Sequence, residues 1–175
     1  MRGMPSRHRL VSRRQNATHV RGQPYQIDML DVASHRRTPL FKHPVYNLLY
    51  GHFSPDGRWV SFTVRVQPNR SRIVIAPVDE PKPVPESAWI KITEEGAEDW
   101  ADWSPDGRTL YFTSERDGHT CLWGQRIEVN SHRPSGEAFV IKHFHGRTFY
   151  PQGGVGQPPE TALRLCFQRI LAMFG

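Results

Sequence analysis

The stretch "HFSPDGRWVSF" at residues 52–62 returns almost unchanged as "DWSPDGRTLYF" at residues 102–112. An alignment without gaps places Phe53 opposite Trp103 and Phe62 opposite Phe112. A period of roughly 40–50 residues built from short strands is typical of the blades of a β-propeller. The duplicated stretch therefore predicts an all-β fold that contains two neighbouring units of one architecture.

The Ser-Pro-Asp-Gly segment shared by both units has the composition of a tight turn. Proline fixes φ, aspartate can bond the backbone two residues further on, and glycine accepts positive φ. Neither serine lies in the G-x-S-x-G context of a nucleophile elbow. We therefore expect structural turns at Ser54, Pro55, Asp56, Gly57 and at Ser104, Pro105, Asp106, Gly107.

An alternating strand follows each turn, and in residues 58–64 Val60, Phe62 and Val64 share one face. Four antiparallel strands in a meander are the plan of one propeller blade. The predicted third strands are 72–78 and 121–129, and the predicted fourth strands are 88–93 and 138–144. The aromatic residues interpreted as blade packing are Trp59, Phe62, Tyr111, Phe112 and Trp123.

These patterns divide the chain into five segments. We predict a basic disordered arm over 1–24, a partial blade over 25–45, blades over 46–95 and 96–146, and an irregular tail over 147–175. The stretch "LVSRRQN" at 10–16 also aligns with "YFTSERDG" of the last blade. The chain is therefore expected to hold about two and a half blades.

The net charge of +6 is concentrated in the arm, because residues 1–24 hold six arginines and no acidic residue. Such an arm could contact nucleic acid or an anionic surface. It has no aromatic residue to stack on bases, so we favour a solvated, disordered leader over a nucleic-acid partner. No apolar run reaches the ~18 residues of a membrane span. Residues 1–20 lack the apolar core of a signal peptide, which predicts a cytoplasmic chain as it stands.

The cores "FSPDGRWVSF" and "WSPDGRTLYF", together with "LDVASHRRTPL" at 30–40, resemble the WD-like propeller repeat of the bacterial TolB-like family. Similar repeats occur in the propellers of prolyl-oligopeptidase-type peptidases. The resemblance covers roughly residues 25–145. It implies a non-catalytic module for protein interaction or ligand sensing, often periplasmic in TolB-like relatives. The alternative that it implies is the gating propeller of a serine peptidase whose catalytic domain is absent here.

Family propellers close with more blades than this chain can supply, so the resemblance also implies a partial propeller. We expect its open blade faces to drive self-association, with Val60, Phe62, Leu110 and Phe112 on strands that face the gap. The protein partner is not identified by the sequence. A truncated gene product is one interpretation of such a chain.

The tail "TALRLCFQRILAMFG" at 161–175 predicts a helix over 161–174. The apolar residues at helical spacing are Leu163, Phe167, Ile170, Leu171 and Phe174. Such a helix could cover an exposed sheet edge. The other interpretation is a tail foreign to the family, from a truncated or frame-shifted coding region. We favour the second, because the segment has no trace of the repeat.

The stretch "TEEGAEDWADW" at 93–103 concentrates carboxylates near the expected channel mouth, where several oxygens could hold Ca²⁺. The candidate ligands are Glu95, Glu98, Asp99 and Asp102, next to Glu94. A solvated loop beside a packed Trp103 is the alternative interpretation. No other feature predicts a cofactor.

Two histidines near the end of the second blade form a further candidate. His143 and His145 would share one face of a strand as a metal-binding pair, but no third ligand lies nearby in the sequence. The spacing of Cys121 and Cys166 suggests neither a disulfide framework nor a zinc site. We therefore expect no metal there.

Overall fold

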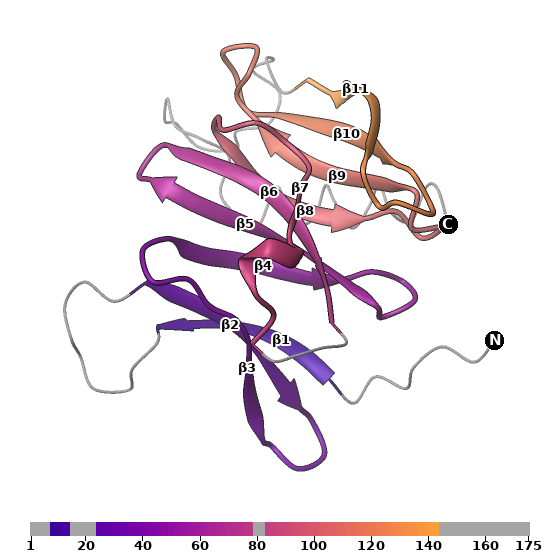
Figure 1. The fold of residues 1–175 in the computed structure, drawn as a ribbon. Helices are drawn as coiled ribbons and strands as arrows, with labels where there is room; N and C mark the ends of the chain where they lie inside the picture. Colours follow the sequence, from indigo (N-terminus) through magenta and orange to yellow (C-terminus); the bar gives the residue numbers. More distant parts are fainter. Residues whose placement is uncertain (1–7, 15–23, 79–82, 144–175) are drawn as a thin grey trace, which may run out of the picture.

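The computed structural model describes residues 8–14, 24–78 and 83–143, and most of them lie in three antiparallel sheets (Figure 1). The first sheet contains β1 (His8–Arg14), β2 (Tyr25–Asp31) and β3 (Arg37–Phe41). The second contains β4 (Asn47–Phe53), β5 (Trp59–Gln67), β6 (Arg70–Pro77) and β7 (Ile90–Lys91). The third contains β8 (Glu98–Trp103), β9 (Thr109–Ser114), β10 (Cys121–Ile127) and β11 (Pro134–Lys142).

The second and third sheets are four-stranded meanders that follow the chain in order. The three sheets stack on one another, and β8 of the third lies against β4, β5 and β6 of the second. The all-β prediction of four-stranded blades is therefore confirmed. Among the described residues, no helix is long and apolar enough to cross a membrane.

The N-terminal segment differs from its prediction as a disordered arm. Residues His8–Arg14 form β1, which pairs with β2 from His8 opposite Asp31 to Arg14 opposite Tyr25. β1 is an outermost strand of its sheet. Outermost strands tolerate many charged residues, so the arginine-rich composition did not distinguish this strand from a solvated leader.

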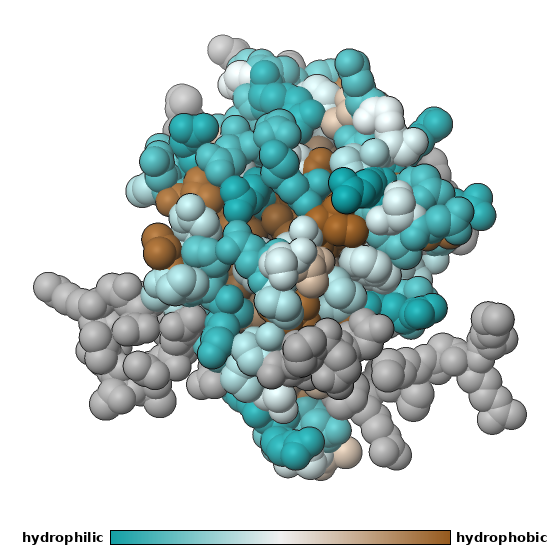
Figure 2. Space-filling model, in the orientation of Figure 1, coloured by the Kyte–Doolittle hydropathy of each residue, from teal (hydrophilic) through white to brown (hydrophobic). Residues whose placement is uncertain are grey.

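The described residues form three core clusters, and two of them lie between neighbouring sheets. Phe62 belongs to the cluster that joins the first two sheets, where its ring stacks on Phe41 with centroids 4.8 Å apart. Phe112 belongs to the cluster between the second and third sheets. Figure 2 shows hydrophobic residues emerging only in places on a mostly hydrophilic face.

The expectation that four apolar residues face an open gap was wrong. Val60, Phe62, Leu110 and Phe112 are fully buried. Alternate residues of a strand point to opposite faces of the sheet, and these four point into the clusters that join neighbouring sheets.

The fourth strand of the second sheet is shorter than the predicted 88–93 and covers only Ile90–Lys91. A short 3-10 helix at Glu86–Ala88 precedes it. Beyond it, the Ile92 N–H still donates to the Ile73 carbonyl oxygen at 2.9 Å. The Ile73 N–H donates instead to the Thr93 hydroxyl at 2.9 Å, so a side chain takes the place of one backbone acceptor. The helix predicted over 161–174 lies outside the described residues.

Candidate functional site

The two Ser-Pro-Asp-Gly segments form the same hydrogen-bonded turn. In the first, the Ser54 hydroxyl donates to Asp56 Oδ1 at 2.6 Å and accepts the Trp59 N–H at 3.0 Å. Gly57 and Gly107 both have a φ of 70°, as this turn requires. The hydroxyls of both serines are therefore used within their own turns.

The second turn repeats this geometry. The Ser104 hydroxyl donates to Asp106 Oδ1 at 2.6 Å and accepts the Thr109 N–H at 2.9 Å. Asp106 Oδ1 also accepts the Arg108 N–H at 3.0 Å. The Ser104 hydrogen bond, followed by that from the Arg108 backbone, lowers the pKa of Asp106 because both favour the ionised carboxylate.

The first strand of each four-stranded sheet carries a bulge at the same place. The pairing of β4 with β5 shifts between Leu49 and His52, and that of β8 with β9 shifts between Asp99 and Asp102. The bulges put Tyr50 and Trp100 in the left-handed region, with φ of 53° and 54°. Bulky L-residues rarely adopt this conformation. The backbone is therefore strained at the equivalent position of both four-stranded sheets.

The two strained residues meet across the boundary between the sheets. The rings of Tyr50 and Trp100 stack with centroids 4.6 Å apart and an interplanar angle of 27°. Next to them, His52 Nδ1 lies 2.8 Å from the Ala101 carbonyl oxygen. We define the first-strand surface as Tyr50, His52, Arg65, Asp99, Trp100 and Asp102.

The acidic residues predicted as calcium ligands do not converge on one point. Each has a different neighbour: Glu95 pairs with Arg72 at 2.9 Å, Glu98 with Arg116 at 2.9 Å, Asp99 with Arg65 at 2.5 Å, and Asp102 lies 3.8 Å from His52. The adjacent Glu94 pairs with Lys91 at 2.8 Å. In the described part of the chain, these carboxylates are not among the side chains grouped closely enough for one ion.

Two of these carboxylates are largely buried where the second and third sheets meet. Burial raises the pKa of Glu98, although Arg116 partly offsets the effect. Burial also raises the pKa of Asp99, against the influence of Arg65. The Ser71 hydroxyl donates to the Glu98 carbonyl oxygen, so this corner of the third sheet is bonded to β6. The arrangement fits a structural junction between blades.

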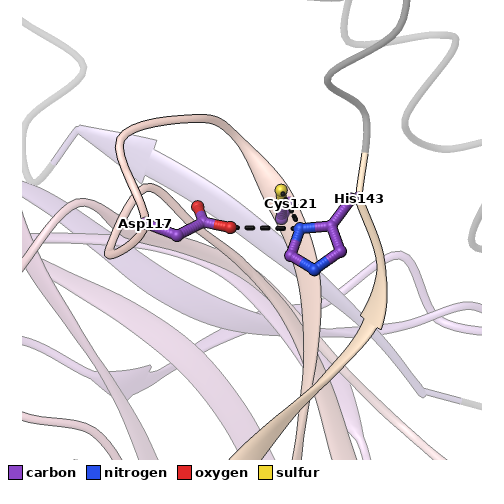
Figure 3. Close-up of side chains that lie close together, drawn as sticks. All are labelled: Asp117, Cys121 and His143. Atoms are coloured by element: carbon purple, nitrogen blue, oxygen red, sulfur yellow. Dashed lines mark hydrogen bonds and ion pairs between the residues drawn. The ribbon is translucent and has the colours of Figure 1, made fainter.

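A different cluster lies at the far end of the third sheet (Figure 3). His143 follows β11, Cys121 begins β10, and Asp117 lies in the turn between β9 and β10. His143 Nδ1 is 3.4 Å from Cys121 Sγ and 3.1 Å from Asp117 Oδ2. Of these three residues, spacing along the chain indicated only His143 as a candidate metal ligand, and neither Cys121 nor Asp117 was expected beside it. The signal was the meander itself, which brings the start of β10 to the end of β11 through the pair Leu122 and Lys142. His145 lies outside the described residues.

No family model and no curated protein matches the sequence. Among solved structures, TolB from Acinetobacter baumannii is similar with a TM-score of 0.52 at 18% identity, covering 69% of this chain and 27% of that one. A protein from Agrobacterium tumefaciens assigned as TolB gives a TM-score of 0.56 at 21% identity, covering 77% of this chain and 42% of that one. The chain has the fold of a partial TolB-like propeller. The β-propeller domain of the Trilobed protease from Pyrococcus furiosus gives 0.48 at 19% identity, covering 77% and 39%.

The similarity in fold to TolB indicates how the sheets are arranged relative to a propeller axis. The four-stranded sheets are blades, and the blades of a propeller surround a central channel. The first strands of the two complete blades, β4 and β8, carry most of the first-strand surface. The Asp117, Cys121 and His143 cluster lies instead near the outermost strand, β11.

Proposed function

We propose that this propeller segment is a non-catalytic protein-interaction module that binds a polypeptide at its first-strand surface. The observation that carries the proposal is the stack of Tyr50 on Trp100, two residues in left-handed conformation at equivalent positions of neighbouring blades. Strained backbone of this kind clusters at binding sites, where the surrounding fold sustains its cost. Tyrosine and tryptophan are also the residue types that dominate protein interfaces.

The polar groups around the stack support peptide recognition. His52 and Asp102 are both partly exposed and lie 3.8 Å apart beside the aromatic rings. An aromatic centre with polar groups at its rim is the usual anatomy of a protein interface. The proposal that the module has no catalytic role is supported by Ser54 and Ser104, whose hydroxyls are engaged inside their turns.

The test uses a phage-displayed library of random peptides selected on the full immobilised chain. We expect enriched peptides to bind the chain and to lose at least about tenfold in affinity when Tyr50→Ala or Trp100→Ala is introduced. His132→Ala is the matched control. It removes another stacked pair, that of His132 with Trp59 at 4.1 Å, away from the first-strand surface. Circular dichroism of each variant establishes that it is folded.

Two outcomes would contradict the proposal. One is a selection in which no peptide is enriched above the empty support. The other is a set of enriched peptides whose affinity falls equally in His132→Ala and in the two first-strand variants, because binding would then not depend on this surface.

A further inference from the structure

In the cluster of Asp117, Cys121 and His143, two side chains lie within contact distance of the same imidazole nitrogen. Cys121 Sγ lies 3.4 Å and Asp117 Oδ2 lies 3.1 Å from the same atom, His143 Nδ1. The three potential ligand atoms all lie within 4.8 Å of one another. Figure 3 shows the side chains pointing toward a common centre from a turn and two strand ends.

With a single proton, His143 Nδ1 can make a strong hydrogen bond to only one of these two neighbours. If Nδ1 carries the proton, it can donate a good hydrogen bond to Asp117 but leaves the thiol of Cys121 beside a donor. If Nδ1 is bare, it accepts from the thiol and faces a carboxylate oxygen with its lone pair. A shared cation would instead accept electron pairs from the sulfur, the nitrogen and the oxygen together.

The same geometry argues against a hydrolytic triad. In a triad the acid and the nucleophile occupy opposite nitrogens of the imidazole, so that a proton can pass through the ring. Here Asp117 and Cys121 both lie at Nδ1 of His143. The arrangement has the form of a ligand set and not of a proton relay.

We propose that Asp117, Cys121 and His143 bind Zn²⁺. Thiolate, imidazole and carboxylate are the three ligand types that zinc takes in proteins, with bonds of ~2.0–2.3 Å. Tetrahedral bonds of that length place ligand atoms ~3.3–3.8 Å apart. The two separations from His143 Nδ1 are 3.4 and 3.1 Å and all three atoms lie within 4.8 Å of one another, so a small adjustment of the side chains would fit them around the ion. A soft thiolate also favours zinc over calcium or magnesium, which take oxygen ligands.

Binding exchanges a proton for the ion. Zn²⁺ bonds to Cys121 Sγ, the thiol S–H bond breaks, and its proton passes to the solvent. The residue Cys121 is fully buried, whereas the side chains of Asp117 and His143 are 24% and 50% exposed. The ion therefore has a route from solvent. Bound there, it would fasten the β9–β10 turn to the end of β11.

The test uses Co²⁺ as a spectroscopic substitute for Zn²⁺ on the full chain carrying Cys166→Ser. In that background Cys121 is the only thiol. We expect a thiolate-to-cobalt charge-transfer band with visible absorption of tetrahedral type, both abolished when Zn²⁺ is added. The affinity for Zn²⁺ is then measured by competition with a chelator.

Three variants identify the ligands. Cys121→Ser should abolish the charge-transfer band, and His143→Ala and Asp117→Asn should each weaken Zn²⁺ binding by at least about tenfold. His35→Ala, at an exposed histidine in the turn between β2 and β3, should leave the affinity unchanged. Because Cys121 is buried and its variant could unfold, Asp117→Asn is the decisive change, with circular dichroism as the check on folding.

The proposal is overturned if Co²⁺ gives no thiolate band in the Cys166→Ser chain. It is equally overturned if folded Asp117→Asn and His143→Ala bind Zn²⁺ as tightly as His35→Ala does. Neither result would affect the first-strand surface, so this inference and the proposed function are tested independently.

Discussion

Arg65 of β5 donates a hydrogen bond to Asp99 of β8, so an ion pair joins the second and third blades. The two side chains are 31% and 26% exposed, and solvent therefore screens their attraction only in part. We expect a double-mutant cycle with Arg65→Met and Asp99→Asn to give a coupling of about 1 kcal/mol in the free energy of unfolding.

The expected sign of the coupling free energy between the two substitutions follows from the burial of Asp99. Arg65→Met leaves the Asp99 carboxylate partly buried without its cation, so it should cost more stability in the native background than beside Asp99→Asn. Urea unfolding of the four proteins measures the coupling. Additive effects within error would show that the pair contributes nothing to the blade junction.

Gly107 should be difficult to replace by a β-branched residue. Its φ of 70° lies in the left-handed region, and we expect Gly107→Val to lower the free energy of unfolding by ~1–3 kcal/mol. A Cβ atom there would lie 3.8 Å from Pro55 Cδ, an ordinary contact, so the penalty belongs to the backbone. Gly107→Asn should cost less, because asparagine tolerates this region. If urea melts show that Gly107→Val and Gly107→Asn lower the free energy of unfolding equally, the explanation from backbone conformation is rejected.

Asp106 should make stability depend on pH in the acid range. Its pKa is lowered in the folded chain from an ordinary value of 3.8, so its contribution is fully present above that value and is lost as the pH falls through the lowered pKa. Asp106→Asn should therefore destabilise the chain most near neutral pH, with the difference from the native chain shrinking in acid. Urea midpoints across this range measure the trend, and Asp56→Asn should repeat it.

The blades and turns could be predicted from the sequence because their determinants are local. The Ser-Pro-Asp-Gly segments contain the donors, acceptors and glycine that their turns need, within a few residues of one another. Alternation of apolar residues predicted the apolar face of β5, with Val60 and Phe62, whereas the polar Ser61 and Thr63 on the opposite face are also fully buried.

The bulges and the metal-binding cluster depend on pairing between strands, which local patterns do not encode. The sequence around Tyr50 and Trp100 does not indicate a bulge, and the shifted register places both residues in the left-handed region. Cys121 and His143 are brought together by the pairing of β10 with β11, which itself contains register shifts. A search by spacing along the chain could not find a ligand set assembled in this way.

We expect the purified chain to hydrolyse neither peptide nor ester substrates. Among the described residues, Asp117, Cys121 and His143 combine the group types of a hydrolytic triad, but the acid and the thiol both lie at one imidazole nitrogen and provide no relay. Chromogenic ester and peptide assays on the native chain and on Cys121→Ser test this prediction. Turnover that survives rigorous purification and disappears in the variant would refute it.

In the described part of the chain, the two complete blades and the three-stranded first sheet stack without closing into a ring, and we expect the isolated chain to self-associate through its outer blade faces. At ~25 cal/mol per Å², a few hundred Å² of exposed apolar surface corresponds to several kcal/mol, comparable to the stability of a small domain. Light scattering combined with a urea melt measures both properties. A monodisperse monomer with a cooperative transition of several kcal/mol would contradict this expectation.

The two Ser-Pro-Asp-Gly turns satisfy their polar groups from inside their own loops, through bonds that reach no further than from Ser54 to Trp59 or from Ser104 to Thr109. Neither turn needs a hydrogen-bonding partner from another blade. A segment that carries such a turn can be duplicated or deleted in a gene without leaving its loop unsatisfied. Copying or removing one such unit by recombination would therefore leave the hydrogen bonds of every remaining hairpin turn intact.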